Sequence, residues 1–324
     1  MIFIFLLGLE CAYILFAKRM GIVDSPHRQS SHTGDVVRGG GIIFFVAYLL
    51  WSASHDFQWV GGIIGLTVLV GVSFIDDIRD VNPKIRLACQ FVAIILMLYH
   101  SGLVRNSPHV ILLLSFFCVG TLNIFNFMDG INGMTGGYSL VVALALLYVN
   151  TNVVHFASSD LIVTMILSLV VFNLFNFRQR TICFAGDVGS LAIGFIFVYL
   201  VLRLCLRGES MSWIAMLSVY LVDGGLTILH RILLRENLMK PHKKHAYQIM
   251  ANELEIPHLV VSGIYMALQS VCCVVYIMWP GYPAFFAIFG VLTVMYILFM
   301  KKFYHLHENN LGTQHCQWSS RCWG

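Results

Sequence analysis

Eleven apolar runs of 16 to 22 residues follow one another along this chain of 324 residues. A helix needs about 20 apolar residues to cross the hydrocarbon core of a bilayer, so each run has roughly spanning length. The composition agrees, because 58% of the residues are hydrophobic and 11% are charged, whereas about a quarter of a soluble domain is charged. The sequence therefore predicts an all-α, polytopic transmembrane helical bundle of about eleven spans, near residues 2–18, 39–54, 57–75, 86–102, 108–127, 136–151, 159–177, 187–206, 211–230, 258–279 and 282–302.

The rest of the composition excludes several other classes of protein. The 9 cysteines include no CxxC pair, which argues against structural zinc and against a disulfide framework. No internal repeat is visible, so we expect one polytopic domain over residues 1–304, followed by a polar tail over 305–324 with no assigned role. The first run lacks a small-residue cleavage site and precedes Lys18 and Arg19, which indicates a permanent anchor.

Lysine and arginine are distributed unevenly between the two sides of such a bundle. With eleven spans, the loops after odd-numbered helices share one side with the C-terminus. That side carries 17 of the 20 Lys and Arg residues, and the other carries Arg105, Arg203 and Arg207. Because positive loops stay in the cytoplasm, we expect a periplasmic N-terminus and a cytoplasmic C-terminus. The net charge of +4 is then a topology signal and gives no reason to expect nucleic acid.

Acidic residues gather in the segment FIDDIRD, at the cytoplasmic end of the third run. Asp76 and Asp80 are four residues apart and share a helical face, with Asp77 about 100° round from Asp76. Three carboxylates this close repel one another, and Mg²⁺ with phosphate oxygens would relieve the repulsion. The alternative is a solvated loop start whose acids pair with nearby bases, namely Arg79, Lys84 and Arg86.

The segment NIFNFMDGINGMTGG ends the fifth run and is the most specific in the chain. Asn123, Asn126 and Asp129 recur every three residues and form one helical stripe. The glycines that follow allow backbone to approach a ligand, and amides at the next helix start suit an anion. The alternative is helix packing through small residues, with the amides satisfied internally.

Two further aspartates lie at or within later spans. In FAGDVGS, Asp187 stands at the mouth of the eighth run, either as a metal ligand or as an N-cap with Ser190 nearby. Asp223 lies inside the ninth run, where we expect a structural pair with Arg231.

Basic residues concentrate in the longest cytoplasmic loop, which contains PHKKHAYQ. His242 and His245 are three apart without the Glu of HExxH, so phosphate binding, with Lys244, is favoured over zinc hydrolysis. The alternative is attraction of the loop to anionic lipid head groups. Arg38 is interpreted in the same way, together with its neighbours in the first loop, His27, Arg28 and His32.

These five segments all fall on one side of the membrane in a chain with only 16 acids. Carboxylates for a divalent cation, combined with His, Lys and Arg for phosphates, indicate phosphoryl transfer, in which catalysis is mainly positioning and charge neutralisation.

In this order, the motifs resemble those of the polyprenyl-phosphate N-acetylhexosamine-1-phosphate transferases. The matching segments are RQSSHTGDVVRGGG, FIDDIRD, NIFNFMDGINGMTGG, FAGDVGS and PHKKHAYQ, which cover most of the chain. The PHKKHAYQ segment is most similar to that of the branch that initiates O-antigen in bacteria. Two positions depart from the family pattern: Asn132, where many members carry Asp, and Tyr220, where proline often stands.

The resemblance implies a multi-pass enzyme of the bacterial inner membrane with its active site on the cytoplasmic side. It would transfer N-acetylhexosamine 1-phosphate from a UDP-N-acetylhexosamine to undecaprenyl phosphate, release UMP and use Mg²⁺, with Mn²⁺ as a substitute. Whether the enzyme is a homo-oligomer is left open, as is the identity of the sugar.

The resemblance also implies roles for individual residues. Asp187 would bind the metal, Asp76 and Asp77 would be the motif's aspartate pair, with Asp76 also at the metal, and His242 with His245 would contact phosphates. The residues expected to bind substrate are Asn123, Asn126, Asp129, Asn132, Arg38 and Lys244.

Two mechanisms stay open at this point. In direct attack, Asp76 or Asp77 removes a proton from the lipid phosphate, whose oxygen attacks the phosphorus bonded to the sugar. In a covalent route, one of these aspartates is the nucleophile.

Two other functions remain as alternatives. A Mg²⁺-dependent membrane prenyltransferase could use DDxxD but would need a second Asp-rich motif, and none is found. A lipid or secondary transporter would place its ionisable residues near the membrane midplane, whereas most acids here lie at cytoplasmic helix ends.

Overall fold

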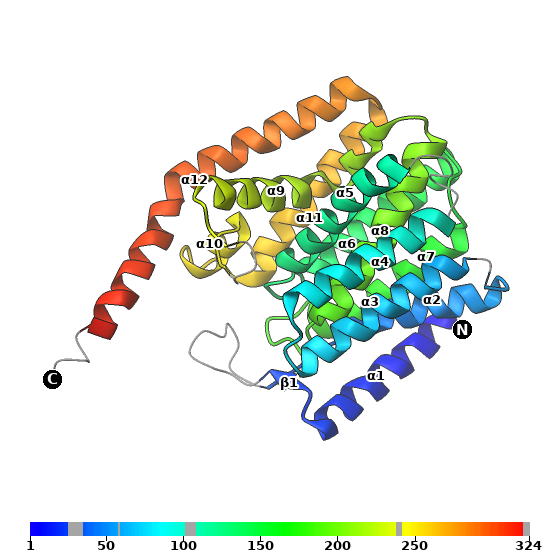
Figure 1. Ribbon diagram of the computed structural model, residues 1–324, viewed down its shortest axis with the longest axis horizontal. Helices are drawn as coiled ribbons and strands as arrows, with labels where there is room; N and C mark the ends of the chain where they lie inside the picture. The colour runs from blue at the N-terminus through cyan, green and yellow to red at the C-terminus, as the bar shows by residue number, and fades with distance from the viewer. Residues whose placement is uncertain (25–34, 58, 101–107, 238–241, 320–324) are drawn as a thin grey trace.

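The computed structural model describes residues 1–24, 35–57, 59–100, 108–237 and 242–319. The helices are α1 (Ile2–Met20), α2 (Ile42–Ser54), α3 (Val60–Ile78), α4 (Pro83–His100), α5 (Pro108–Met128), α6 (Met134–Asn152), α7 (Ser159–Asn176), α8 (Gly186–Arg207), the 3₁₀ helix η1 (Met211–Leu217), α9 (Ser218–Leu233), α10 (Ala246–Asn252), α11 (His258–Met278) and α12 (Tyr282–Ser319). Figure 1 shows how these helices are arranged in a single bundle.

The predicted membrane helices all form. Within the described ranges, nine helical segments are long and apolar enough to cross a bilayer, with η1 and α9 counted as one. The shorter apolar helix α2 and the 19-residue α1 correspond to the first two predicted runs. The prediction of an all-α polytopic membrane protein is therefore confirmed.

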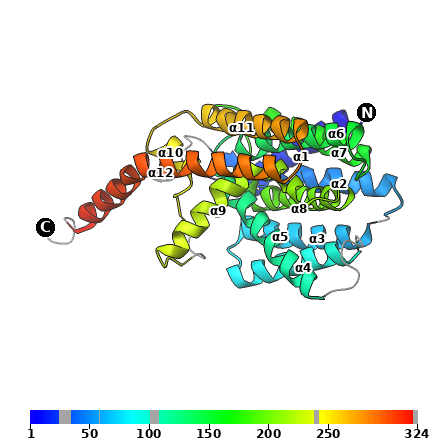
Figure 2. The same ribbon diagram turned by 90° about the horizontal axis from the view of Figure 1, so that it is seen from above.

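Helix α8 lies at the centre of the bundle. Its sequence between Leu191 and Leu204 is apolar on nearly every side, which is typical of a helix with no exposed face. In its most apolar window 94% of the residues are buried, against 17% for α12. Figure 2 shows α8 between α6, α7 and α11 on one side and α3, α4 and α5 on the other.

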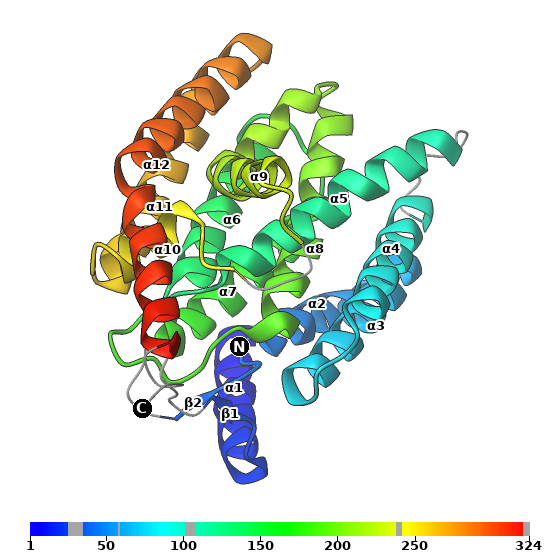
Figure 3. The same ribbon diagram turned by 60° about the vertical axis from the view of Figure 1, so that its left-hand side comes forward.

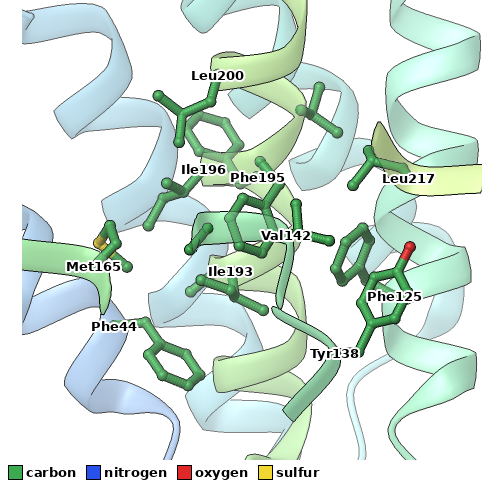
Figure 4. Packing of buried hydrophobic residues seen from close by; sticks show 14 of the residues in the cluster. Phe44, Phe125, Tyr138, Val142, Met165, Ile193, Phe195, Ile196, Leu200 and Leu217 are labelled. Carbon is green, nitrogen blue, oxygen red and sulfur yellow. The ribbon is translucent and has the colours of Figure 1, made fainter. Parts of the chain in front are cut away.

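The core around α8 is built from large side chains of several helices. Figure 4 shows Ile193, Phe195 and Ile196 of α8 facing Phe44 of α2 and Phe125 of α5. The Phe44 and Phe125 side chains are fully buried. Helix α12, in contrast, lies at the edge of the bundle, where a lipid-facing helix is expected (Figures 1 and 3).

Close backbone contact joins α2 to the start of α8. A Cβ atom added to Gly41 would lie 2.3 Å from the Cα atom of Gly189, so no side chain fits between them. The first-loop glycine run therefore brings α2 against the first turn of α8, which begins at Gly186.

Three features differ from the sequence predictions. A small antiparallel pair, β1 (Val23–Asp24) with β2 (Val36–Val37), was not expected in an all-α chain. Helix α10 is also additional, and α12 continues to Ser319, into the segment predicted to be a polar tail. The strands are two residues long, and Val37 also bridges to Cys183, a contact that the local sequence does not encode.

Candidate active site

Asp77, in the last turn of α3, caps the N-terminus of α8. Its Oδ1 accepts a hydrogen bond from the backbone N–H of Asp187 at 3.2 Å, and its Oδ2 accepts one from Val188 at 3.3 Å. The first amides of a helix have no partner within the helix, and the helix dipole favours a negative charge there. This contact brings the end of α3 and the start of α8 together.

Arg86, in the first turn of α4, connects the other two carboxylates. Its Nη1 lies 2.5 Å from Asp76 Oδ2, and its Nη2 donates to Asp187 Oδ2. Asn126 of α5 donates to Asp187 Oδ1 at 2.8 Å and to Ser190 Oγ at 3.1 Å. Asp76, Asp77 and Asp187 therefore converge at one end of the bundle, with four helices contributing to the cluster.

This acid cluster has the oxygen donors that Mg²⁺ prefers. Within the described ranges, no three His, Cys, Asp or Glu side chains are grouped as a protein-only metal site would require. Mg²⁺, however, is usually held by one or two carboxylates, with phosphate and water oxygens completing its coordination. Arg86 places a cation between Asp76 and Asp187, which shows that this pair accommodates positive charge. The donor set fits Mg²⁺ together with a phosphate ligand.

Asp129 follows α5 directly and belongs to the same cluster electrostatically. Burial, together with repulsion from the carboxylates of Asp187 and Asp77, raises its pKa to about 7 against a lowering by a hydrogen bond to Thr135. A carboxyl group in this situation is stabilised as an anion when a cation arrives.

Asn123 and Asn132, both expected to bind substrate, hydrogen-bond to other parts of the protein. Asn123 Nδ2 donates to Gln90 Oε1 of α4 at 2.7 Å and so joins α4 to α5. Asn132 Nδ2 donates to the carbonyls of Arg178 and Gln179, at 3.1 and 3.2 Å. These bonds agree with the alternative interpretation, in which the amides are satisfied internally, and substrate binding by the two residues stays a prediction.

The two histidines of the PHKKHAYQ segment lie side by side, with their ring centroids 4.9 Å apart. Both rings contact Phe127, at centroid distances of 5.7 Å for His242 and 6.1 Å for His245. Tyr247 donates a hydrogen bond to the Phe127 carbonyl at 2.7 Å. The loop is therefore docked on the end of α5, next in sequence to Asn126.

These rings carry buried nitrogens without hydrogen-bond partners among the described residues: both nitrogens of His242 and Nε2 of His245. Buried polar groups are usually bonded, so such atoms indicate a ligand or ordered water. Burial lowers the pKa of His242 to about 3, helped by the charges of His245 and Arg231. His242 is thus neutral at physiological pH in this state.

Asp223 orients His245, a role that the sequence did not reveal. Its Oδ1 lies 3.3 Å from His245 Nδ1 and accepts the Ala246 N–H at 3.2 Å, and its Oδ2 accepts the Tyr265 hydroxyl at 2.5 Å. The expected pair of Asp223 with Arg231 is wrong. Arg231 Nε is bonded to Glu236 Oε2 at 3.1 Å. The sequence feature that could have indicated the role of Asp223 is its position as an acid inside an apolar span, which favours a functional role.

The cations expected to bind substrate have acidic partners here. Arg38 Nη2 donates to Asp24 Oδ1 at 2.6 Å, and Lys244 Nζ donates to Glu236. Arg86, treated at first as a possible surface partner of the acids, is the arginine that lies within the cluster. The first-loop residues His27, Arg28 and His32 are outside the described residues.

Gly186→Ala is expected to destabilise the protein by about 1–3 kcal/mol. Gly186 has φ +70°, and an added Cβ atom would lie 2.5 Å from Asp77 Oδ2, the atom that caps α8. The measurement is thermal unfolding of the detergent-purified protein. Gly71→Ala in α3 is the control, because no atom lies within 4 Å of the new Cβ. Equal melting temperatures for the two variants would contradict the close approach of Asp77.

Comparison with known proteins finds a consistent set of relatives. The family model described as glycosyl transferase family 4 matches residues 59–205. A Yersinia pestis protein named undecaprenyl-phosphate alpha-N-acetylglucosaminyl 1-phosphate transferase is 30% identical over 63% of this chain and 61% of its own length. The protein of the same name from Escherichia coli K12 is 29% identical over 58% of this chain and 56% of its own.

A Bacillus subtilis protein is named a probable undecaprenyl-phosphate N-acetylglucosaminyl 1-phosphate transferase. It is 26% identical over 71% of this chain and 70% of its own length. The match thus covers less than two thirds of the length of the Yersinia and Escherichia relatives. The family-model match includes Asp76, Asp77, Asn126 and Asp187 but ends before the histidine loop.

Proposed function

Because the chain belongs to glycosyl transferase family 4, we propose that it transfers N-acetylhexosamine 1-phosphate from a UDP-sugar to undecaprenyl phosphate. The reaction releases UMP and starts a lipid-linked glycan such as O-antigen. The observation that carries this proposal is the convergence of Asp76, Asp77 and Asp187 at the start of α8. The end of α5 lies beside this cluster, and His242 and His245 pack there against Phe127. Anionic metal ligands and imidazole N–H donors at the same helix ends suit a metal-bound pyrophosphate.

Asp187 and Asp76 are the proposed ligands of Mg²⁺, for which Mn²⁺ would substitute. When bound, the ion neutralises the pyrophosphate and stabilises the departing UMP. Arg86 already contacts both carboxylates and offers further N–H donors to a phosphate oxygen. Asn126 holds Asp187 Oδ1 from the side of α5, which keeps the carboxylate oriented.

Asp77 is the better candidate for the base. Asp76 is engaged by the Arg86 guanidinium at 2.5 Å and by the Val81 N–H at 2.8 Å. Among the described residues, Asp77 accepts two long amide hydrogen bonds, at 3.2 and 3.3 Å, so its oxygens are less committed than those of Asp76. It would take the proton of the lipid phosphate.

The lipid phosphate oxygen then forms a bond to the phosphorus that carries the sugar. The bond from this phosphorus to the bridging oxygen breaks, and its electron pair leaves with UMP. His245 Nε2 and the one ring N–H of His242 are the proposed phosphate contacts, since both rings carry buried nitrogens without partners in the described part of the chain. Charge-assisted bonds to phosphate would satisfy them.

The proposed location is a bacterial inner membrane, with the reaction on the cytoplasmic side. The acid cluster lies at the ends of α3 and α5 and the start of α8, which the positive-inside rule assigns to the cytoplasm. The uneven distribution of Lys and Arg, 17 of 20 on that side, supports this orientation.

The test is a UMP-release assay on detergent-purified protein with undecaprenyl phosphate, Mg²⁺ and a panel of UDP-sugars. UDP-GlcNAc is the first donor to examine, because the relatives are named for N-acetylglucosaminyl transfer. We expect UMP release that requires both the lipid phosphate and the ion. Transport of a substrate without UMP release would favour a transporter, and prenyl transfer from a prenyl diphosphate would favour a prenyltransferase.

Asp223→Asn is expected to lower kcat by about 10–100-fold, with KM and the melting temperature changed little. Asn at this position can still accept the Ala246 N–H through its single oxygen and can donate its amide N–H to the Tyr265 hydroxyl, but it no longer holds His245 as a carboxylate. Asp223 is a positioning residue, so its loss should also change the pH profile of kcat. Thr227→Val is the control, because it removes a 3.3 Å bond to Asp223 without contacting His245. Parallel losses of stability and activity in Asp223→Asn would instead indicate a structural role.

A further inference from the structure

A cavity lies at the opposite end of α8 from the acid cluster. It has a volume of about 410 Å³ and is lined by the end of α2, the start of α3, the last turns of α8 and the segment before α7. Pockets that bind small molecules typically have volumes of about 300–1,000 Å³, and this cavity falls in that range. Because α8 has 22 residues, it is roughly 33 Å long, which matches the hydrocarbon thickness of a bilayer. The cavity therefore faces the membrane surface opposite the acid cluster.

Two arginines one helical turn apart line this cavity, Arg203 and Arg207. Arg203 is held in place, since its Nε donates to the Phe156 carbonyl at 3.2 Å and its guanidinium lies 5.0 Å from the centroid of Trp59. Neither arginine pairs with a carboxylate in the part of the chain that the structure describes. Asp160, at the same end, lies 3.8 Å from His55.

Aromatic side chains also line the cavity, beside the two histidines His55 and His155. Trp59 and Tyr199 pack edge to face with centroids 5.1 Å apart, and Trp51 Nε1 donates to Ser158 Oγ at 3.4 Å. Both tryptophans therefore have fixed positions. Trp and Tyr are typical of the membrane interface, where lipid head groups lie.

The few positive charges on this side of the membrane are concentrated at the cavity. By the topology above, the side carries only 3 of the 20 Lys and Arg residues, and 2 of them line this one cavity. Arginine binds phosphate through paired N–H donors, and basic pockets between membrane helices bind lipid head groups.

We propose that this cavity binds the phosphate group of an anionic lipid in the leaflet opposite the acid cluster. Arg203 and Arg207 would contact the phosphate oxygens, with Trp59 holding Arg203 in position. Free inorganic phosphate has the same anionic chemistry and is the other source to be distinguished.

The test is native mass spectrometry of the full chain in detergent with short-chain phosphatidylglycerol, phosphatidylcholine or inorganic phosphate. We expect phosphatidylglycerol to bind in preference to phosphatidylcholine, and Arg207→Gln to raise its Kd by about tenfold. Arg207 is exposed and makes no contact with the acid cluster, so UMP release in detergent should be unchanged. Lys301→Gln, an exposed basic residue of α12, is the matched control.

Each outcome decides the proposal. Weaker phosphatidylglycerol binding in Arg207→Gln, with unchanged binding in Lys301→Gln, supports a lipid phosphate site. If Arg207→Gln loses binding of inorganic phosphate but not of phosphatidylglycerol, the cavity binds a soluble anion and the proposal of a lipid site is overturned. Equal weakening in Lys301→Gln would reduce the effect to general surface charge and overturn the proposal. Unchanged binding in both Arg207→Gln and Arg203→Gln would also overturn the proposal. The second variant is included because Arg203 could bind the phosphate when Arg207 is replaced.

Discussion

Asp187→Asn is expected to lower UMP release by about 10³-fold. Asparagine keeps the size of the side chain and can still accept the hydrogen bond from Asn126. It removes the charge that attracts both Mg²⁺ and Arg86, and this charge is what the proposed reaction depends on. The measurement is the rate of UMP release across a range of Mg²⁺ concentrations, together with calorimetry of Mg²⁺ binding alone.

The matched control for this variant is Asp160→Asn. Asp160 is an aspartate at the opposite end of the bundle, with a side chain that is 80% exposed, and its replacement should leave both readouts unchanged. Near-normal turnover and unaltered Mg²⁺ binding in Asp187→Asn, with a normal elution profile, would remove Asp187 from the metal site.

His242→Gln is expected to lower kcat by about 10²-fold while the protein still inserts and folds. Glutamine is polar and fills much of the same space, but it cannot place an imidazole N–H donor against a phosphate. The ring nitrogens of His242 are buried without partners among the described residues, beside His245 and Phe127. The measurement is the steady-state rate of UMP release at saturating UDP-sugar.

The same variant should change the acid sensitivity of the protein. Burial lowers the pKa of His242 from 6.5 to about 3, with the charges of His245 and Arg231 contributing. Between these values the unfolded chain binds a proton that the folded chain excludes, so stability is full above about pH 6.5 and falls as the pH decreases. The decrease grows as the pH falls from 6.5 towards 3, and His242→Gln should lack it.

His230→Gln is the control for both readouts. Its ring contacts Tyr304 at 5.0 Å and not the His242–His245 pair. Full activity in His242→Gln would contradict the proposed phosphate contact. An unchanged dependence of melting temperature on pH would contradict the buried neutral state of His242.

The membrane architecture could be predicted because its cause is local. A run of about 20 apolar residues must cross the bilayer as a helix, whatever its neighbours are. The strand pair at Val23 and Val36 and the short helix α10 could not be predicted in this way. These elements form through contacts with distant segments, and they are too short for hydrophobic periodicity to reveal.

The acids and histidines of the candidate site were also visible in the sequence, since polar residues at the ends of apolar helices are costly without a purpose. Their partners were not. Arg86 and Asp187 are separated by 101 positions, and His245 and Asp223 by 22. The sequence offered Arg79, Lys84 and Arg86 as equal partners for the acids, and tertiary packing selected Arg86.

The sequence by itself determined which segments lie in the membrane, the order of the polar motifs and the expected side on which they meet. The tertiary structure decided which side chains meet there: Asp77 on the amides of α8, Arg86 between Asp76 and Asp187, and Asp223 behind His245. The physical reason is the separation along the chain of the residues that interact. Burial and helix formation depend on neighbouring residues along the chain, whereas an ion pair within about 4 Å depends on how separate helices pack.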